Sequence, residues 1–352
     1  ANAAVPASAH AFANNWNLRT KQAPLNFSQS FSIGNQTKLF HRDFGYIMGF
    51  KYGSAVQSDA SAESNRAAVA ANDSGVLVRT YASRQDQNVT KESNGWSGLL
   101  NLACKLNPNN TVALMFMPNY SGVNNTRQSV DYRDPSNYVV TLSQFYEQRR
   151  QLVYQLRTEH YLPASKVKIE ANASYTDGKS SAPDFKNLQY YKDPISNAFQ
   201  IGGSIGDGIH RYYRYLSDKM IDSRLSAEIP LDSTPGLTRK IKFGGAYQHT
   251  KRDYNQYDYA INFGPTSYAL LNEDIDAYLS PDKFDVRSGV DVNGIPYSTL
   301  DLYYVQFESP ANHTIGTSDI ASAFAMTDYA LTSLLRVSGG VRVEQSKLFT
   351  DV

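Results

Sequence analysis

The residues best suited to binding chemistry are arginines and tyrosines in the polar stretches of the chain. Guanidinium groups bind phosphate and carboxylate oxygens in pairs. The arginines near predicted strand ends therefore either contact an anionic ligand or lipopolysaccharide phosphate, or pair with carboxylates such as Glu147, Glu159 and Glu170. Tyrosine rings of the segment 259–314 can stack on sugars or planar chelates. The candidate ligand-binding residues are Arg149, Arg150, Arg211, Tyr268, Tyr278, Tyr303 and Tyr304.

The same segment, 259–314, is rich in carboxylates, which are the ligands that Ca²⁺ prefers. They are Glu273, Asp274, Asp276, Asp282, Asp285, Asp291 and Asp301. Two interpretations of this segment stay open: a long loop that binds Ca²⁺ through these carboxylates, or a solvated loop whose carboxylates are ordinary turn residues. The stretch from Asp291 to Gly294 resembles the start of a calcium loop but lacks the downstream glutamate, so a turn is expected there.

No spacing in the chain proposes covalent catalysis. The glycine-rich stretch 202–208 lacks the Lys-Ser/Thr of a phosphate-binding loop, and the six histidines form no i, i+4 pair. Cys104 is the single cysteine, so neither an intrachain disulfide nor a thiolate metal cluster can form. An outer-membrane enzyme would need a Ser/His/Asp or Asp/His group facing the lumen. No spacing in the sequence suggests such a group, so we do not expect an enzyme.

The elements that must position these side chains are strands with two different faces. The segment 166–178 places Val167, Ile169 and Ala171 on one face and Lys168, Glu170 and Asn172 on the other. The segments 237–248 and 335–346 alternate in the same way. A series of such strands predicts an all-β, antiparallel transmembrane barrel, with apolar residues toward lipid and charged residues toward the lumen.

The strands are predicted in five hairpins, about ten strands in all. Their turns lie near 39–43, 107–110, 163–165, 232–236 and 328. The connections between hairpins are predicted to be long polar loops over 54–93, 121–143, 178–211 and 259–314. Short turns at one rim and long loops at the other are typical of outer-membrane barrels. Strand residues continuing past the apolar part, as in 146–151 and 249–254, indicate a tall barrel.

Composition narrows the function classes. A net charge of +1 gives no argument for a nucleic-acid partner. No run of about 18 apolar residues is present, so the sequence contains no transmembrane helix. The 25 tyrosines and 16 phenylalanines are compatible with the aromatic girdles of a barrel.

Several segments resemble TonB-dependent receptors of Bacteroidota. Residues 14–26 resemble the stretch that opens the barrel after the plug domain, and 39–46 is similar to the first periplasmic turn. Residues 145–156, 173–185 and 337–344 also resemble this family, so the resemblance covers nearly the whole chain.

The resemblance implies a barrel of about 22 strands, with a plug in its lumen, that imports a scarce ligand across the cell outer membrane with energy from TonB. Residues 1–352 would form a partial barrel, because no plug or TonB box precedes the first strand and only about ten strands are predicted. The implied partners are outer-membrane lipid and lipopolysaccharide, the TonB complex through the plug, a small-molecule or glycan ligand such as a siderophore or oligosaccharide, and a surface lipoprotein. The alternative is a smaller, complete barrel acting as a porin or adhesin.

Overall fold

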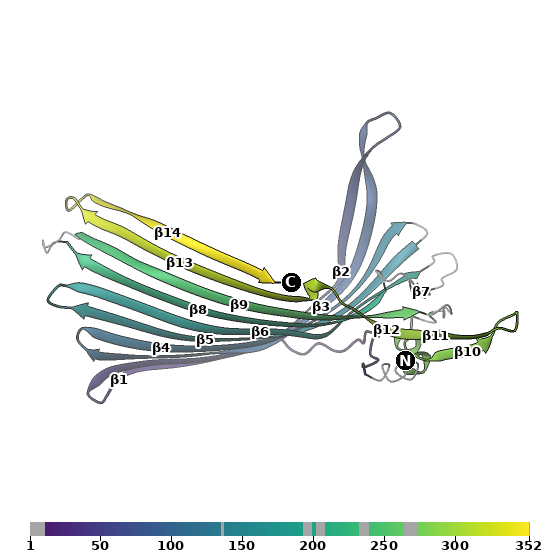
Figure 1. The fold of residues 1–352 in the computed structure, drawn as a ribbon, viewed down its shortest axis with the longest axis horizontal. Coiled ribbons are helices and arrows are strands. Elements are labelled where there is room, and N and C mark those ends of the chain that lie inside the picture. Colours follow the sequence, from purple (N-terminus) through teal and green to yellow (C-terminus); the bar gives the residue numbers. More distant parts are fainter. Residues whose placement is uncertain are drawn as a thin grey trace.

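The computed structural model describes residues 11–134, 137–192, 199–201, 208–231, 239–263, 270 and 273–351. Nearly all of them belong to one antiparallel sheet of twelve strands (Figure 1). Its main path, in spatial order, is β1 (Phe27–Leu39), β2 (Arg42–Ala71), β3 (Leu77–Asn107), β4 (Asn110–Asp134), β5 (Asn137–Leu162), β6 (Val167–Lys192), β8 (Ile209–Pro230), β9 (Arg239–Phe263), β13 (His313–Ala330) and β14 (Arg336–Asp351). Two further strands, β7 (Phe199–Ile201) and β12 (Leu302–Phe307), pair with β6 and β9.

The five predicted hairpins are confirmed, and they follow one another across the sheet in chain order. The hairpins are β1–β2, β3–β4, β5–β6, β8–β9 and β13–β14. The described short connections lie at one end of the sheet, on the left in Figure 1, which we call the turn end. Phe40 and His41, in left-handed backbone conformations, make the first of these connections. The opposite end is called the loop end.

The prediction of long loops over 54–93 and 121–143 is wrong. Strand β2 continues to Ala71 and β3 begins at Leu77, while β4 continues to Asp134 and β5 begins at Asn137. Most of these residues are polar, and the apolar ones, such as Val140 and Leu142, are too few to give the sustained period-two pattern that marks a half-buried strand. Backbone pairing does not require that pattern, and the β2–β3 hairpin extends well beyond its neighbours in Figure 1.

The segment 259–314 contains more structure than the predicted loop. It holds the end of β9, a short helix α2 (Ile275–Tyr278), the 3₁₀ turns η1 (Pro281–Lys283) and η2 (Pro310–Asn312), the hairpin β10 (Val286–Val290) with β11 (Pro296–Leu300), and β12. The turn expected at Asp291 to Gly294 is confirmed: Asp291 Oδ1 accepts hydrogen bonds from the backbone N–H groups of Asn293 and Ile295 at 2.9 and 2.8 Å. Gly294 adopts a φ of +80° there, which suits glycine.

The sheet has an apolar face and a charged face, as the alternation predicts. Directly paired residues share a face, so Ala171 lies in one row with Thr158 and Leu225. Its sequence neighbour Asn172 lies in a row with Arg157 and Arg224 on the opposite face. The apolar residues on the same face as Ala171, in its own row and in the adjacent rows, are called the apolar band. Its members include Leu100, Leu102, Leu114, Phe116, Tyr154, Leu156, Ala173, Tyr175, Ile221, Leu225 and Phe243.

Large apolar side chains of the band are exposed instead of packed. Leu225 is 57% exposed and Leu114 is 53% exposed. Along β6 the band extends from Val167 to Tyr175, roughly 27 Å at about 3.4 Å per residue. A transmembrane barrel presents an outward apolar band of about 25 Å. Contiguous exposed apolar surface of this size marks a face that another apolar phase or partner covers.

The buried core lies at the loop end and includes a segment that precedes the sheet. Trp16 packs there with Tyr278, Phe284 and Leu302, residues more than 250 positions away in the chain. Gln144 Nε2 donates to the Trp16 carbonyl oxygen at 2.6 Å, and Asn17 Oδ1 accepts from the backbone N–H of Ile275 at 2.9 Å. These contacts fix the N-terminal segment and helix α2 onto β5, β6 and β8.

Closure into a barrel is not seen. Within the described residues β1 and β14 each pair on one side only, and they form opposite edges of the sheet in Figure 1. The barrel of about 22 strands therefore stays a prediction. In the part of the chain that the structure describes, no helix is long and apolar enough to cross a membrane.

Gly244 on β9 is held by close packing. A Cβ atom at this position would lie 2.4 Å from the carbonyl oxygen of Leu225 and 2.9 Å from the ring of Phe324. Gly244→Ala is therefore expected to lower the free energy of unfolding by about 1–3 kcal/mol through overpacking. Denaturant unfolding of the whole protein measures the change, and Gly339→Ala is the control, because a Cβ at Gly339 meets no atom within 4 Å. Equal stability of the two variants would contradict this account.

Candidate functional site

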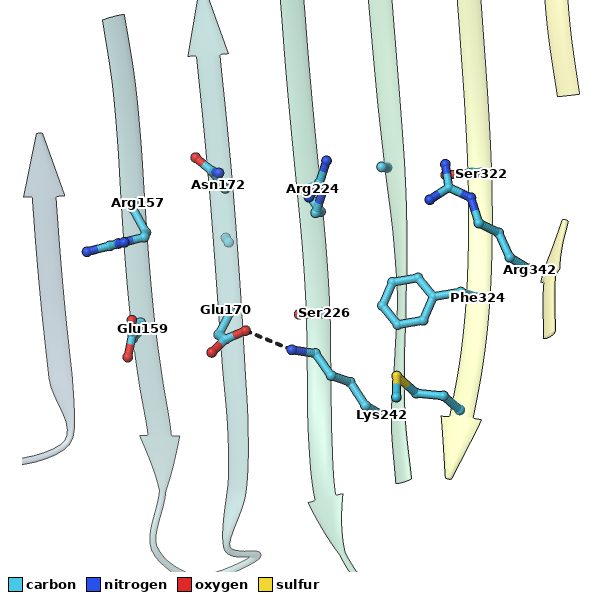
Figure 2. Close-up of a pocket in the computed structure, with 13 residues that line it drawn as sticks. Arg157, Glu159, Glu170, Asn172, Arg224, Ser226, Lys242, Ser322, Phe324 and Arg342 are labelled. Atoms are coloured by element: carbon cyan, nitrogen blue, oxygen red, sulfur yellow. Dashed lines mark hydrogen bonds and ion pairs between the residues drawn. The ribbon is translucent and has the colours of Figure 1, made fainter. Parts of the chain in front are cut away.

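The candidate site is a hollow on the charged face, toward the turn end of the strands from β5 to the edge strand β14. Its volume is about 520 Å³, and side chains from β5, β6, β8, β9, β13 and β14 line it. Figure 2 shows these side chains rising from neighbouring strands on one face. The polar lining residues include Arg157, Glu159, Glu170, Asn172, Arg224, Ser226, Lys242 and Arg342. The sequence predicted this face through Lys168, Glu170 and Asn172, but not that β9, β13 and β14 contribute to the same hollow.

Ion pairs crossing several strands organise the hollow. Glu159 and Glu170 lie directly opposite each other on β5 and β6, an arrangement that would repel without a cation. Lys168 Nζ lies 2.7 Å from Glu170 and 3.3 Å from Glu159, and Lys242 reaches Glu170 at 3.0 Å from β9 (Figure 2). Each carboxylate is thus neutralised by lysine.

Two arginines of the hollow, Arg157 and Arg224, make no ion pair among the described residues, whereas Arg342 pairs with Glu344 Oε2 at 2.6 Å. Arg157 and Arg224 flank Asn172, and the Asn172 Oδ1 atom is buried without a hydrogen-bond partner among the described residues. Four cations and two carboxylates line the hollow, so it suits an anionic or polyhydroxylated group. Phe324 adds an aromatic surface on the β13 side.

The structure places Arg149 and Arg150 on opposite faces of β5. Arg149 lies on the charged face, where its guanidinium contacts Glu147 at 2.8 Å and its side chain is 68% exposed. Arg150 lies on the apolar face, above the apolar band, and pairs with Asp177. Both arginines therefore have the carboxylate partners that the alternative interpretation expected, and they cannot contact one ligand together from one side of the sheet.

Arg211 is buried at the loop end and is 1% exposed. Its Nε and Nη2 atoms donate to the two carboxylate oxygens of Asp184 at 2.6 and 2.7 Å, and Nη2 also donates to the Ala13 carbonyl oxygen at 2.9 Å. The guanidinium lies 4.9 Å from the ring centre of Phe12. Arg211 thus connects the N-terminal segment to β6 and β8.

The charges around Arg211 are balanced within the buried cluster. Burial acts to raise the pKa of Asp184, but the hydrogen bonds and charge of Arg211 outweigh it and lower that pKa. Burial, together with the charge of Arg211, lowers the pKa of Lys186, whose Nζ donates to the Asn15 carbonyl oxygen at 2.8 Å. Burial and the neighbouring Asp184 raise the pKa of Tyr213 to about 12.

The predicted tyrosines are divided between the core and the surface. Tyr278 is buried in the loop-end core, and Tyr304 packs against it with its hydroxyl 3.4 Å from Arg211 Nη1. Tyr303 alternates with Tyr304 on β12 and so lies on the other side of that strand. Tyr268 lies outside the described residues. Of the seven predicted residues, the structure brings together Arg211, Tyr278 and Tyr304, and ligand contact by any of them stays a prediction.

The carboxylates of 259–314 serve local structure. Asp274 caps helix α2 by accepting from the backbone N–H of Ala277 at 3.1 Å, and Glu273 accepts from the Tyr190 hydroxyl at 2.6 Å. Asp276 Oδ1 accepts from the backbone N–H of Asn17 at 3.1 Å. Among the described residues, no group of three or more His, Cys, Asp or Glu side chains could hold a metal ion. The structure therefore gives no support to the expected Ca²⁺ site within those residues, and the glycine-rich stretch 202–207 lies outside them.

Sequence reasoning missed a second groove, on the apolar face. Its lining includes Trp96, Tyr120 and Lys179 from β3, β4 and β6. These residues are far apart in the chain and carry no motif, and only the strand register brings them into one row. Comparison with protein-family models, curated proteins and solved structures gives no match for this chain.

Proposed function

We propose that this chain forms part of the wall of a transmembrane β-barrel in the cell outer membrane. The supporting observation is the twelve-stranded antiparallel sheet with one exposed apolar face and one charged face. In the hydrocarbon core of a bilayer, each unpaired backbone N–H or C=O group raises the free energy by roughly several kcal/mol. The open edges of β1 and β14 therefore require further strands to pair with them. Strands such as β3, with 31 residues, exceed the 9–11 or so that cross the membrane, and the excess stands beyond it.

The function we propose is TonB-dependent import of a scarce ligand through the completed barrel, as the family resemblance implies. The charged hollow would then face the lumen, where it meets either the ligand or a plug. Its arginines suit an anionic siderophore or the hydroxyl groups of an oligosaccharide. No residue is assigned a covalent step.

The orientation of the two faces is testable with neighbouring positions. Ala171→Cys and Asn172→Cys are introduced singly into the full-length protein, in a background where its other cysteines are replaced. After reconstitution into lipid vesicles, a spin label at Ala171→Cys is expected to be accessible to oxygen, which dissolves in lipid. A label at Asn172→Cys is expected to be accessible to a water-soluble nickel reagent. Equal accessibility of both labels to the nickel reagent would refute a lipid-facing apolar band.

Import is tested by uptake of a panel of labelled ferric siderophores and oligosaccharides in cells with and without TonB. Loss of uptake of one of them on TonB deletion supports the importer. Uptake that is unaffected by TonB, with the lipid-facing band confirmed, would instead favour the porin. The spin-label experiment therefore tests whether the sheet faces lipid, and the uptake experiment tests separately whether import depends on TonB.

A further inference from the structure

A row of five residues crosses five strands on the apolar face, just beyond the apolar band toward the loop end. Consecutive pairing places Tyr52, Trp96, Tyr120, Arg150 and Lys179 side by side on β2, β3, β4, β5 and β6. These residues line a groove of about 490 Å³. Lys179 lies four residues beyond Tyr175 on β6, about 13 Å along the strand. The groove therefore sits at the border of the band that the proposed function assigns to lipid.

The groove is positively charged. Arg150 and Lys179 line it, and no carboxylate is among the described lining residues. Lys179 is exposed and has no ion-pair partner in the part of the chain that the structure describes. Arg150 pairs with Asp177 below the groove, and its Nε atom has no hydrogen-bond partner. Arg150, Lys179 and Asp177 together carry a net charge of +1, and Lys179 supplies the excess positive charge.

The other half of the groove is an aromatic platform. The rings of Trp96 and Tyr120 stack with centroids 4.6 Å apart and planes 15° apart, and Phe50 lies 6.0 Å from Trp96. Trp96 lies between the rings of Tyr120 and Phe50 and is 36% exposed, so it is the edge of the indole that a ligand can reach. Amide groups of Asn94 and Gln148 line the next row. Indole and phenol rings at a membrane border bring a polar edge to the headgroup level.

We propose that this groove binds the phosphorylated sugar headgroup of a glycolipid in the membrane leaflet that surrounds the protein. Lys179 and Arg150 contact the phosphate, the exposed edges of Trp96 and Tyr120 contact the sugar, and the acyl chains lie along the apolar band below. This inference rests on the proposed lipid-facing orientation of the band. It assigns Arg150 to membrane lipid, on the opposite face of β5 from the lumen-side Arg149.

The test measures binding of lipopolysaccharide micelles to the purified full-length protein in a neutral detergent. Lys179→Gln and the double variant Arg150→Gln/Lys179→Gln are compared with wild type. The double variant is expected to bind at least about tenfold more weakly, as for lost charge-assisted hydrogen bonds to phosphate. Lys179→Gln breaks no described ion pair, so it keeps the test valid even if Arg150→Gln disturbs folding. Arg252→Gln, a cation of the charged face paired with Asp218 at 2.6 Å, is the control and should bind like wild type.

Two results would overturn the proposal. One is unchanged affinity in the folded Lys179→Gln variant, and the other is equal affinity of wild type for lipopolysaccharide and its dephosphorylated form. The spin-label comparison at Ala171 and Asn172 tests the orientation of the band separately. A lipid-facing band together with either of these results would refute the headgroup site alone and leave the proposed function standing.

Discussion

Leu225→Arg is expected to lower the free energy of unfolding by about 2–4 kcal/mol when the protein is in a bilayer. Leu225 lies in the apolar band, paired with Ala171 and Gly245, and is 57% exposed. If lipid covers this face, the arginine must either leave water or distort the bilayer. If water covered it, the same exposed substitution would change stability by no more than about 0.5 kcal/mol. The size of the effect therefore distinguishes the two environments.

The measurement is denaturant unfolding of the full-length protein in lipid vesicles. Ser174→Arg is the control: the same residue is introduced on the charged face, about 10 Å along the strands from the row of Leu225 and Ala171. Ser174 pairs across β6 and β8 with Asp222, which offers the new guanidinium a carboxylate partner. We expect the control to differ little from wild type. Equal stability of Leu225→Arg and wild type would refute a lipid-facing band.

Arg211→Met is expected to destabilise the loop-end core by about 3 kcal/mol, because the partly buried Asp184 carboxylate loses its two short bonds to the guanidinium and keeps the longer, 3.5 Å contact with Lys186 Nζ. The guanidinium also holds Ala13, so its loss releases the N-terminal segment from the sheet. Hydrogen exchange of the full-length protein should therefore show faster exchange around residues 13–17 and helix α2. Exchange at the turn end should not change, because Arg211 has no contact there.

Two further variants show whether the cause is the unpaired charge. Arg211→Met combined with Asp184→Asn should recover part of the lost stability, because the uncompensated carboxylate charge is removed while the amide oxygen can still accept from Lys186, which lies 3.5 Å from Asp184. Tyr304→Phe removes only the 3.4 Å hydrogen bond to Arg211 and should cost no more than about 1.5 kcal/mol. If the single and double variants were equally unstable, the ion pair would not be what holds this core.

The lowered pKa of Asp184 gives this core a defined response to acid. Its carboxyl has a lower pKa in the folded protein than in the unfolded chain, so the unfolded state binds its proton first as the pH falls. The stabilisation that the ionised Asp184 gives the fold is complete at pH values above the usual pKa range of a carboxyl group. It disappears as the pH falls through the pKa of Asp184 in the folded protein. Acid should therefore release the N-terminal segment only below the usual range of aspartate, and in Arg211→Met this protection should be weaker, because Lys186 alone then lowers the pKa of Asp184 among the groups named.

The strands and their hairpins could be predicted because the signals are local. The alternation of Val167, Lys168, Ile169 and Glu170 repeats within a few residues, and turn residues such as Asn107 to Asn110 mark hairpin ends. The polar strand extensions could not be predicted in this way. Residues such as those of 121–134 have no apolar face, and what makes them a strand is the backbone ladder with β3 and β5.

The sequence by itself determined which side chains share a face within one strand, because the side-chain period of two needs no partner. It also determined that charge and apolar surface alternate along the sheet. Only the tertiary structure decided which residues of different strands meet, because that depends on strand register. Thus Lys242 reaches Glu170 across β8, Trp96 lies in one row with Lys179, and Arg211 holds Ala13 from 198 positions away. It also separated Arg149 from Arg150, adjacent in the chain but on opposite faces of β5.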